Sequence, residues 1–194
     1  MSGKDFNVRY GFKKMIKLTS QTSIHNGFEY KEGLNVLVEP FNKEPICGPG
    51  GLYCCYPSTV SQWFRYGNKL MYYKWDVSIP NDAKVVAMGN KLKVDKFVLS
   101  NKRPLWTTDF CAYVIRGLED GRNYIEDIIP AEFKTADVCK FIIEHYAQYQ
   151  DEFFHNVDVK VLRQVAHLSR KAFKHIPKSE ITYELCMTCV TNDG

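Results

Sequence analysis

At residues 47–53 the chain reads CGPGGLY, and the residues around this glycine-rich stretch decide the fold class. Glycine adopts positive φ angles without the steric penalty of a Cβ atom, so the stretch predicts a tight turn. A short strand follows it, which would place Cys54 and Cys55 on opposite faces, one thiol in the core and one nearer solvent. The stretch lacks the Gly-Lys-Ser/Thr ending of a phosphate-binding loop, which makes it a weak nucleotide signal.

Short runs rich in β-branched and aromatic residues surround the turn and predict a largely antiparallel sheet. They occupy residues 34–38, 71–79, 84–88 and 96–99, and Gly, Pro, Asn or Asp bounds each run. Residues 58–67 begin with a capping serine, place Val60, Trp63 and Phe64 on one face and end at a glycine. This segment predicts one short amphipathic helix.

The second half of the chain has a helical period and contains a repeat. Residues 129–139 and 176–186 share the spacing of proline, threonine and cysteine. Helix-capping residues at Thr107, Thr135, Asp158 and Thr182 imply a unit of about 23 to 28 residues. Cysteines four residues after a cap are expected to pack in the core. Gly121 would end the first helix, and Pro130 and Pro177 belong to connectors.

These patterns predict the α+β class, with a mostly antiparallel sheet module that contains a short helix, followed by an α-helical repeat region. They divide the chain into a basic N-terminal segment at 1–19, an α/β module at 20–104 and an α-helical repeat domain at 105–194. The chain of 194 residues is 45% hydrophobic and 14% aromatic, which is enough to bury a core.

Composition narrows the function classes. No apolar run reaches the roughly 20 residues of a membrane-spanning helix, and no apolar signal core follows Met1, so we expect neither membrane insertion nor secretion. The seven cysteines have no disulfide-framework spacing, which predicts reduced thiols. Cys186 and Cys189 have two residues between them, but no second pair or nearby histidine completes a metal site, so none is assigned.

Charge is divided unevenly along the chain. Residues 1–106 carry 16 Lys and Arg against 8 Asp and Glu, whereas residues 107–194 carry 10 against 14. Opposite signs on the two halves favour docking between them or a partner that recognises one half. Nucleic-acid binding ranks last, because the basic residues do not form a patch interleaved with aromatic residues.

Several sequence blocks occur in the order of a known viral module. They are HNGFEY at 25–30, GLN at 33–35, GGLY at 50–53, FRYG at 64–67, IPNDA at 79–83 and KVDKFVL at 93–99. This order resembles the N-terminal module of ankyrin-repeat proteins encoded by giant DNA viruses of amoebae. Downstream the chain departs from that family, because no Thr-Pro-Leu-His ankyrin signature appears. The resemblance implies a viral protein that works in the host cytoplasm.

A second, weaker resemblance concerns ADP-ribosyltransferase domains. It implies that His25 hydrogen-bonds the ribose of NAD, that Tyr53 stacks on nicotinamide and that Lys96 occupies the position of the catalytic glutamate. An ammonium group cannot stabilise the positive charge that develops on the sugar, so transfer activity would be lost. Asp95 would point to the opposite face of its strand and is a poor replacement. NAD is the only cofactor that either resemblance suggests.

The candidate ligand-binding residues are therefore His25, Gly51, Tyr53, Tyr66 and Lys96, and no catalytic residue is assigned. Two structural alternatives stay open, in which His25 satisfies backbone groups of a turn and the glycines only shape one.

The leading functional hypothesis is a non-catalytic protein–protein interaction module that binds a viral or host protein. The alternative is a degenerate ADP-ribosyltransferase-like or nucleotide-binding domain. A homodimer is a further expectation, because an open helical array leaves an uncapped face.

Overall fold

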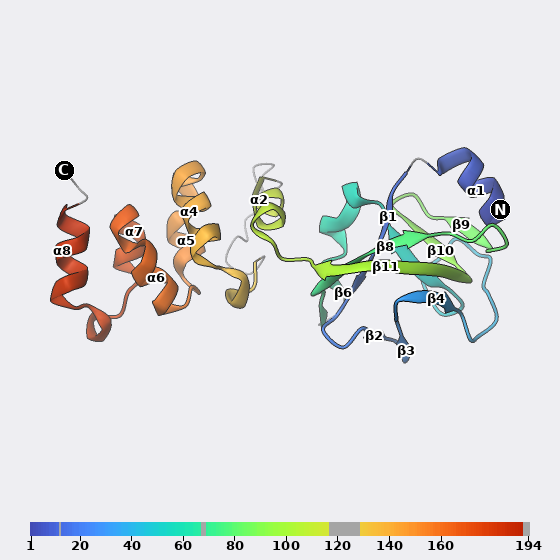
Figure 1. Ribbon diagram of the computed structural model, residues 1–194, viewed down its shortest axis with the longest axis horizontal. Coiled ribbons are helices and arrows are strands. Elements are labelled where there is room, and N and C mark those ends of the chain that lie inside the picture. The colour runs from blue at the N-terminus through green and yellow to red at the C-terminus, as the bar shows by residue number, and fades with distance from the viewer. Residues whose placement is uncertain (12, 67–68, 117–128, 192–194) are drawn as a thin grey trace. The chain divides into compact units, whose positions relative to one another are not determined.

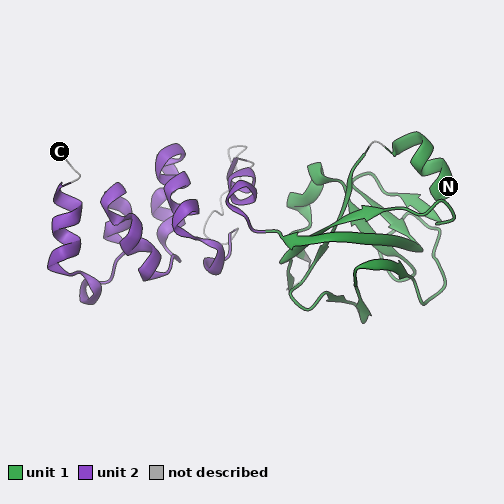
Figure 2. Ribbon diagram, viewed as in Figure 1, with its two compact units in different colours: residues 1–105 green, residues 106–194 purple. Residues whose placement is uncertain are grey.

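The computed structural model describes residues 1–11, 13–66, 69–116 and 129–191, and the chain divides into two compact units. Unit 1 comprises Met1–Leu105 and unit 2 comprises Trp106–Gly194 (Figure 2). Unit 1 holds the β-strands and unit 2 holds helices (Figure 1). The predicted α+β class is confirmed.

Unit 1 is built on an antiparallel sheet, which among the described residues has the strand order β4-β11-β8-β1-β5-β10-β9. Its strands are β1 (Met15–Thr19), β4 (Gly33–Val36), β5 (Leu52–Cys55), β8 (Tyr73–Ser78), β9 (Val85–Ala87), β10 (Lys91–Val94) and β11 (Lys96–Pro104). Two hairpins accompany it, formed by β2 (Ile24–His25) with β3 (Phe28–Glu29) and by β6 (Arg65–Tyr66) with β7 (Lys69–Leu70).

Two strands of the sheet were not predicted from the sequence. The four predicted runs correspond to β4, β8, β9 and β11, but β1 and β10 were not predicted. Both contain lysines among their apolar residues, MIKLT in β1 and KLKV in β10. Every residue of both strands is buried, so neither strand has the alternation of buried and exposed residues of a half-exposed strand, and their lysines do not mark an exposed face.

The helix predicted at residues 58–67 is shorter and of a different type. A 3-10 helix, η1, spans Pro57–Gln62, and Tyr56 before it provides no side-chain cap. The chain then enters strand β6 directly.

The first residues of the chain are part of unit 1. Helix α1 spans Gly3–Tyr10 and begins with a capping box between Ser2 and Asp5. It is anchored at its start, where the backbone N of Gly3 donates to the carbonyl oxygen of Ala83 at 2.6 Å. Residues 1–19, which the sequence pattern set apart as a basic segment, thus supply this helix and the interior strand β1.

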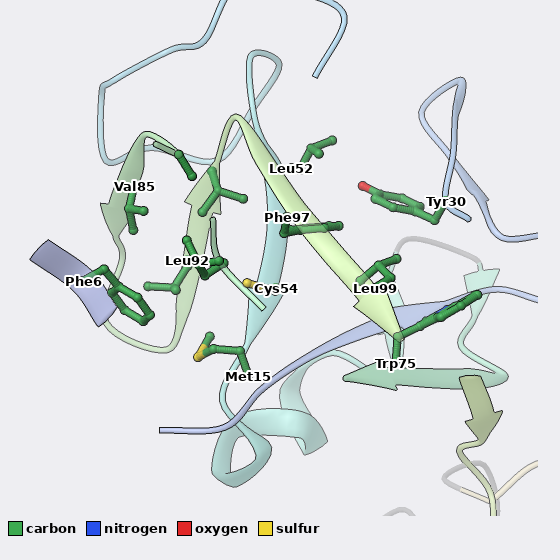
Figure 3. Close-up of a cluster of buried hydrophobic side chains, with 13 residues drawn as sticks. Phe6, Met15, Tyr30, Leu52, Cys54, Trp75, Val85, Leu92, Phe97 and Leu99 are labelled. Carbon is green, nitrogen blue, oxygen red and sulfur yellow. The ribbon is translucent and has the colours of Figure 1, made fainter. Parts of the chain in front are cut away.

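The core of unit 1 lies on one face of the sheet. It contains the buried side chains of Leu52, Leu92, Phe97 and Leu99, which come from β5, β10 and β11 (Figure 3). Burying such side chains contributes about 1.5–3 kcal/mol each to folding.

Unit 2 consists of short helices connected by 3-10 turns. The helices are α2 (Thr108–Arg116), α4 (Ala136–His145), α5 (Gln150–Phe154), α6 (Val159–Val165), α7 (Arg170–Lys174) and α8 (Tyr183–Thr191). The turns are η2 (Ala131–Phe133), η3 (Ala147–Tyr149), η4 (Ala166–Leu168) and η5 (Lys178–Glu180). None of the described helices is long and apolar enough to cross a membrane.

Each of the four predicted capping residues stands at the start of a helix. The side-chain oxygens of Thr107, Thr135, Asp158 and Thr182 accept hydrogen bonds from backbone N–H groups in the first turns of α2, α4, α6 and α8. Pro130 and Pro177 immediately precede η2 and η5, whereas the predicted end at Gly121 lies outside the described residues. Cys111 and Cys139 are fully buried, as expected for core positions, and Cys186 is half-buried.

Candidate functional site

The glycine-rich turn of unit 1 is held by contacts that only glycine allows. Gly50 has a φ angle of +84°, and an added Cβ would lie 2.7 Å from the Cβ of Asn42. Its backbone N donates to Oε1 of Glu39 at 2.9 Å, and its carbonyl oxygen accepts from the backbone N of Asn42 at 2.8 Å. The predicted tight turn with positive φ is therefore confirmed at Gly50.

Gly51 has a different role, because it makes room for a buried lysine. A Cβ at this position would lie 2.2 Å from Cγ of Lys93, whose stem passes directly over the glycine. Lys93 is fully buried, and its Nζ donates to the carbonyl oxygens of Glu44 and Ile46. The lysine thus ties residues 44–46 to strand β10.

Tyr53 closes the turn on its other side. Its hydroxyl donates to the carbonyl oxygen of Gly48 at 2.7 Å and accepts from the backbone N of the same residue at 3.0 Å. The phenol ring thereby spans the distance between strand β5 and the glycine-rich turn.

A cavity of about 630 Å³ lies next to this turn. Strands β1 and β5 are paired at Ile16 and Cys55, whereas β1 pairs with β8 along its whole length. Residues 16–18 of β1 and 52–55 of β5 both line the cavity. Its size is within the range of about 300–1,000 Å³ that small-molecule sites occupy.

Three of the five candidate residues meet at this cavity. His25, Gly51 and Tyr53 all line it, although they are far apart in the sequence. Lys96 does not belong to its lining, because it lies on β11 and pairs with Asp82 at 2.6 Å. Tyr66 belongs to β6, and its side chain lies outside the described part of the chain.

His25 satisfies a backbone group, as its structural alternative expects. Its Nε2 accepts a hydrogen bond from the backbone N of Ser20 at 3.0 Å. Burial, with a smaller effect from the charge of Lys17, lowers the pKa of the imidazole to about 3. Asn26 and Gly27 have φ angles of +50° and +79°, which suit the two-residue turn between β2 and β3. His25 is therefore a neutral hydrogen-bond acceptor at pH 7.

The expectation for Cys54 and Cys55 was wrong in one respect, because both thiols are buried. Side chains pack over both faces of strand β5, so neither thiol reaches bulk solvent. Burial raises the pKa of Cys54 far above its ordinary value and that of Cys55 to about 12. Both thiols stay protonated at neutral pH and are poor nucleophiles.

Sequence reasoning missed the charged groups of the cavity, Lys17 and Lys91. Lys17 is 7% exposed, and its Nζ lies 4.1 Å from the ring centroid of Tyr30. Lys91 is 8% exposed, and its Nζ donates to Sγ of Cys47 at 2.9 Å and lies 4.2 Å from the ring of Trp63. The sequence signal that could have identified them is a lysine flanked by apolar residues within a short strand, as in MIKLT of β1.

Unit 2 contains a second candidate surface, on helix α8. Its outer face carries Tyr183, which is 79% exposed, Met187, and Val190, which is 70% exposed. The spacing of four and three residues places these side chains in one stripe along the helix.

Comparison with known proteins points to one virus. No protein-family model and no solved structure matches the chain. An uncharacterized protein of Acanthamoeba polyphaga mimivirus is 32% identical over 122 residues, covering 60% of this chain and 86% of the relative. A protein of the same virus with a provisional ankyrin repeat name is 31% identical over 155 residues, covering 75% of this chain and 74% of that protein. A longer mimivirus protein, also with a provisional ankyrin repeat name, is 29% identical over 144 residues, which cover 73% of this chain and 29% of that protein.

Proposed function

Because this chain belongs to a mimivirus protein family in which some relatives have ankyrin repeat names, we propose that it is a non-catalytic protein–protein interaction module. Its helical unit presents the binding surface, and it works on a viral or host protein in the host cytoplasm. Arrays of short helices stack into extended surfaces, and binding is their usual role.

The apolar stripe on α8 carries this proposal. Tyr183, Met187 and Val190 expose large apolar side chains along one helix, and Leu168 of the turn η4, which contacts this helix, is also exposed. Contiguous exposed apolar surface of this kind marks interaction sites in soluble proteins.

The charge of the helical half indicates the kind of partner. Residues 107–194 carry 10 Lys and Arg against 14 Asp and Glu, so the stripe lies in an acidic part of the chain. The partner is therefore a protein whose docking face has an apolar centre and a basic rim, because complementary charge favours encounter and register.

The test is quantitative affinity capture from infected amoebae with the full chain as bait. The double variant Tyr183→Ser/Val190→Ser is compared with Val8→Ser/Val38→Ser, which changes two apolar residues of unit 1 that are 83% and 91% exposed. We expect a specific partner that the wild type and the control retain and that the α8 variant loses at least tenfold. Purified wild type and partner should then bind directly in calorimetry.

Two outcomes would contradict the proposal. One is the same set of captured proteins with the α8 variant as with the control. The other is self-association of the wild type in light scattering that the α8 variant abolishes, which would assign the stripe to a homodimer.

A second candidate function is binding of a nucleotide by unit 1. It is favoured by the position of His25 and Tyr53 on one cavity, where the resemblance to ADP-ribosyltransferase domains would place them. We do not extend this candidate to transfer chemistry, because the resemblance puts Lys96 at the position of the catalytic glutamate, and Lys96 is paired with Asp82.

A further inference from the structure

The cavity of unit 1 has an excess of positive charge. Lys17 and Lys91 both line it, and Glu39 supplies the only carboxylate among its described lining residues. That carboxylate accepts from the backbone N of Gly50, and within the described ranges neither lysine forms an ion pair. His25 does not add charge, because it is neutral.

Such an arrangement is costly for the protein alone. A buried ammonium group without a counter-charge loses several kcal/mol of hydration, and a contact with an aromatic ring returns only about 0.5–2 kcal/mol. The aromatic rings of Tyr30 and Trp63 face the two ammonium groups, and the thiol of Cys47 is a weak acceptor for Lys91. The protein therefore leaves both cations short of compensation.

Trp63 also has a buried polar atom. Nε1 of Trp63 is a buried donor, and it has no hydrogen-bond partner among the described residues. Trp63 lines the same cavity as the two lysines. This nitrogen has less than 1 Å² of exposed surface, so a ligand in the cavity does not reach it, and Trp63 contributes the face of its ring to the site.

The rest of the lining is mostly apolar. Phe28, Leu37 and Met71 belong to it, together with the ring of Tyr53. A ligand that fills the cavity therefore needs an apolar or flat body in addition to its charged group.

We propose that this cavity binds a small organic anion, whose phosphate or carboxylate group is attracted by the positive charges of Lys17 and Lys91, which line the cavity from opposite faces of the sheet. The flat body of the ligand packs against the apolar lining of the cavity. This inference rests on the second candidate function, and it adds the charge and the groups that select the ligand.

The experiment uses anions with uncharged counterparts of the same body. AMP is compared with adenosine, and 2-naphthoate with 2-naphthalenemethanol, by calorimetry on the full chain at pH 7 and fixed ionic strength. We expect at least one anion to bind, at least tenfold more tightly than its counterpart. In the wild type, the indole N–H resonance of Trp63 should shift on binding.

Matched lysine variants locate the charge. Lys17→Met and Lys91→Met should each weaken anion binding at least tenfold. Lys102→Met is the control, because Lys102 also lies over aromatic rings, those of Tyr73 and Trp75, but does not line the cavity. Lys91→Arg keeps the charge and should retain binding, which separates loss of charge from loss of folding.

Two results would overturn the inference. Absence of binding by both anions at millimolar concentration would remove the site and, for AMP, the second candidate function as well. Equal binding of an anion and its uncharged counterpart, or unchanged binding by both methionine variants, would refute the role of the lysines and leave a ligand cavity in place.

Discussion

Gly51 and Lys93 pack against each other. The absence of a side chain at Gly51 leaves space in which the long side chain of Lys93 is buried. The lysine stem occupies the space above the glycine, and its ammonium group reaches two backbone carbonyl oxygens. A buried ammonium is tolerated when hydrogen bonds satisfy it. The same residue pair therefore fixes both the turn and the loop at 44–46.

Gly51→Ala should lower the free energy of unfolding by about 2 kcal/mol, because its Cβ would lie 2.2 Å from Cγ of Lys93 and force the stem out of place. Urea denaturation followed by tryptophan fluorescence measures the change. Gly89→Ala is the control, since its φ is +74° with nothing within 4 Å, and it should cost only about 1 kcal/mol of backbone strain. In a Lys93→Ala background the Gly51→Ala cost should fall; equal costs in both backgrounds would contradict the explanation.

Lys17 makes stability depend on pH. Burial lowers the pKa of its ammonium to about 8, whereas the unfolded chain keeps the ordinary value of 10.5. Between these values the unfolded state binds one more proton than the folded state, so this group raises stability as the pH rises through that range. Below pH 8 both states carry the charge, and the folded state bears the full cost of burying it.

Lys17→Met should therefore raise the free energy of unfolding at pH 7 by about 2 kcal/mol in the absence of added anions. The gain should shrink as the pH rises from 8 to 10, because the wild-type lysine then loses its proton in the folded state. Taking the difference between variant and wild type cancels the contribution of Tyr30, whose pKa is raised by burial. The contributions of Cys54 and Cys55, whose pKa values are raised by burial, cancel only in part, because the charge of Lys17 lowers these pKa values. A variant less stable than wild type at pH 7 would refute this account.

At the scale of elements, helix starts in unit 2 depend on side-chain caps, and one cap is linked to a buried amide. Ser169 accepts from the backbone N–H groups of Lys171 and Ala172 at the start of α7. Its hydroxyl also donates to Oε1 of Gln150 at 2.6 Å, and Nε2 of that side chain donates to the carbonyl oxygen of Ile143. One serine thus caps α7 and satisfies the first residue of α5.

Ser169→Ala should cost about 2 kcal/mol of stability, because it removes a cap and leaves the buried Oε1 of Gln150 without its donor. Asp158→Ala, which removes the exposed cap of α6, is the comparison and should cost about 1 kcal/mol. Urea denaturation followed by far-UV circular dichroism measures both. Equal losses in the two variants would show that the contact with Gln150 contributes nothing.

At the scale of the whole molecule, the division of charge agrees with the division into units. The basic half of the chain forms unit 1, whose cavity is lined by two lysines that form no ion pair with the described residues, and the acidic half forms unit 2, which carries the apolar stripe. This division agrees with the different ligands that we propose for the two units, an anion for unit 1 and a protein with a basic rim for unit 2.

Much of the fold could be predicted from local pattern. The starts of α2, α4, α6 and α8 were predicted, because a capping oxygen acts on N–H groups two or three residues away. Gly50 was predicted to shape a turn, since positive φ is a local property of glycine. Strands β1 and β10 could not be predicted, because their lysines conceal the apolar character that only burial reveals.

Some residues of the candidate site could be predicted from the sequence, and others could not. His25, Gly51 and Tyr53 could be selected from the sequence, and the tertiary structure places them on one cavity. Lys17 and Lys91 could not be selected, since a lysine in a sequence is by default an exposed residue.

The glycine turn, the helix starts and the unequal charge of the two halves follow from local sequence, because each depends on residues close together in the chain or on composition alone. Which lysines are buried, and what they face, follows from the folded arrangement of distant segments. Lys17 faces Tyr30, and Lys91 faces Trp63 and Cys47, which lie far from these lysines in the sequence, so their burial is a property of the folded assembly.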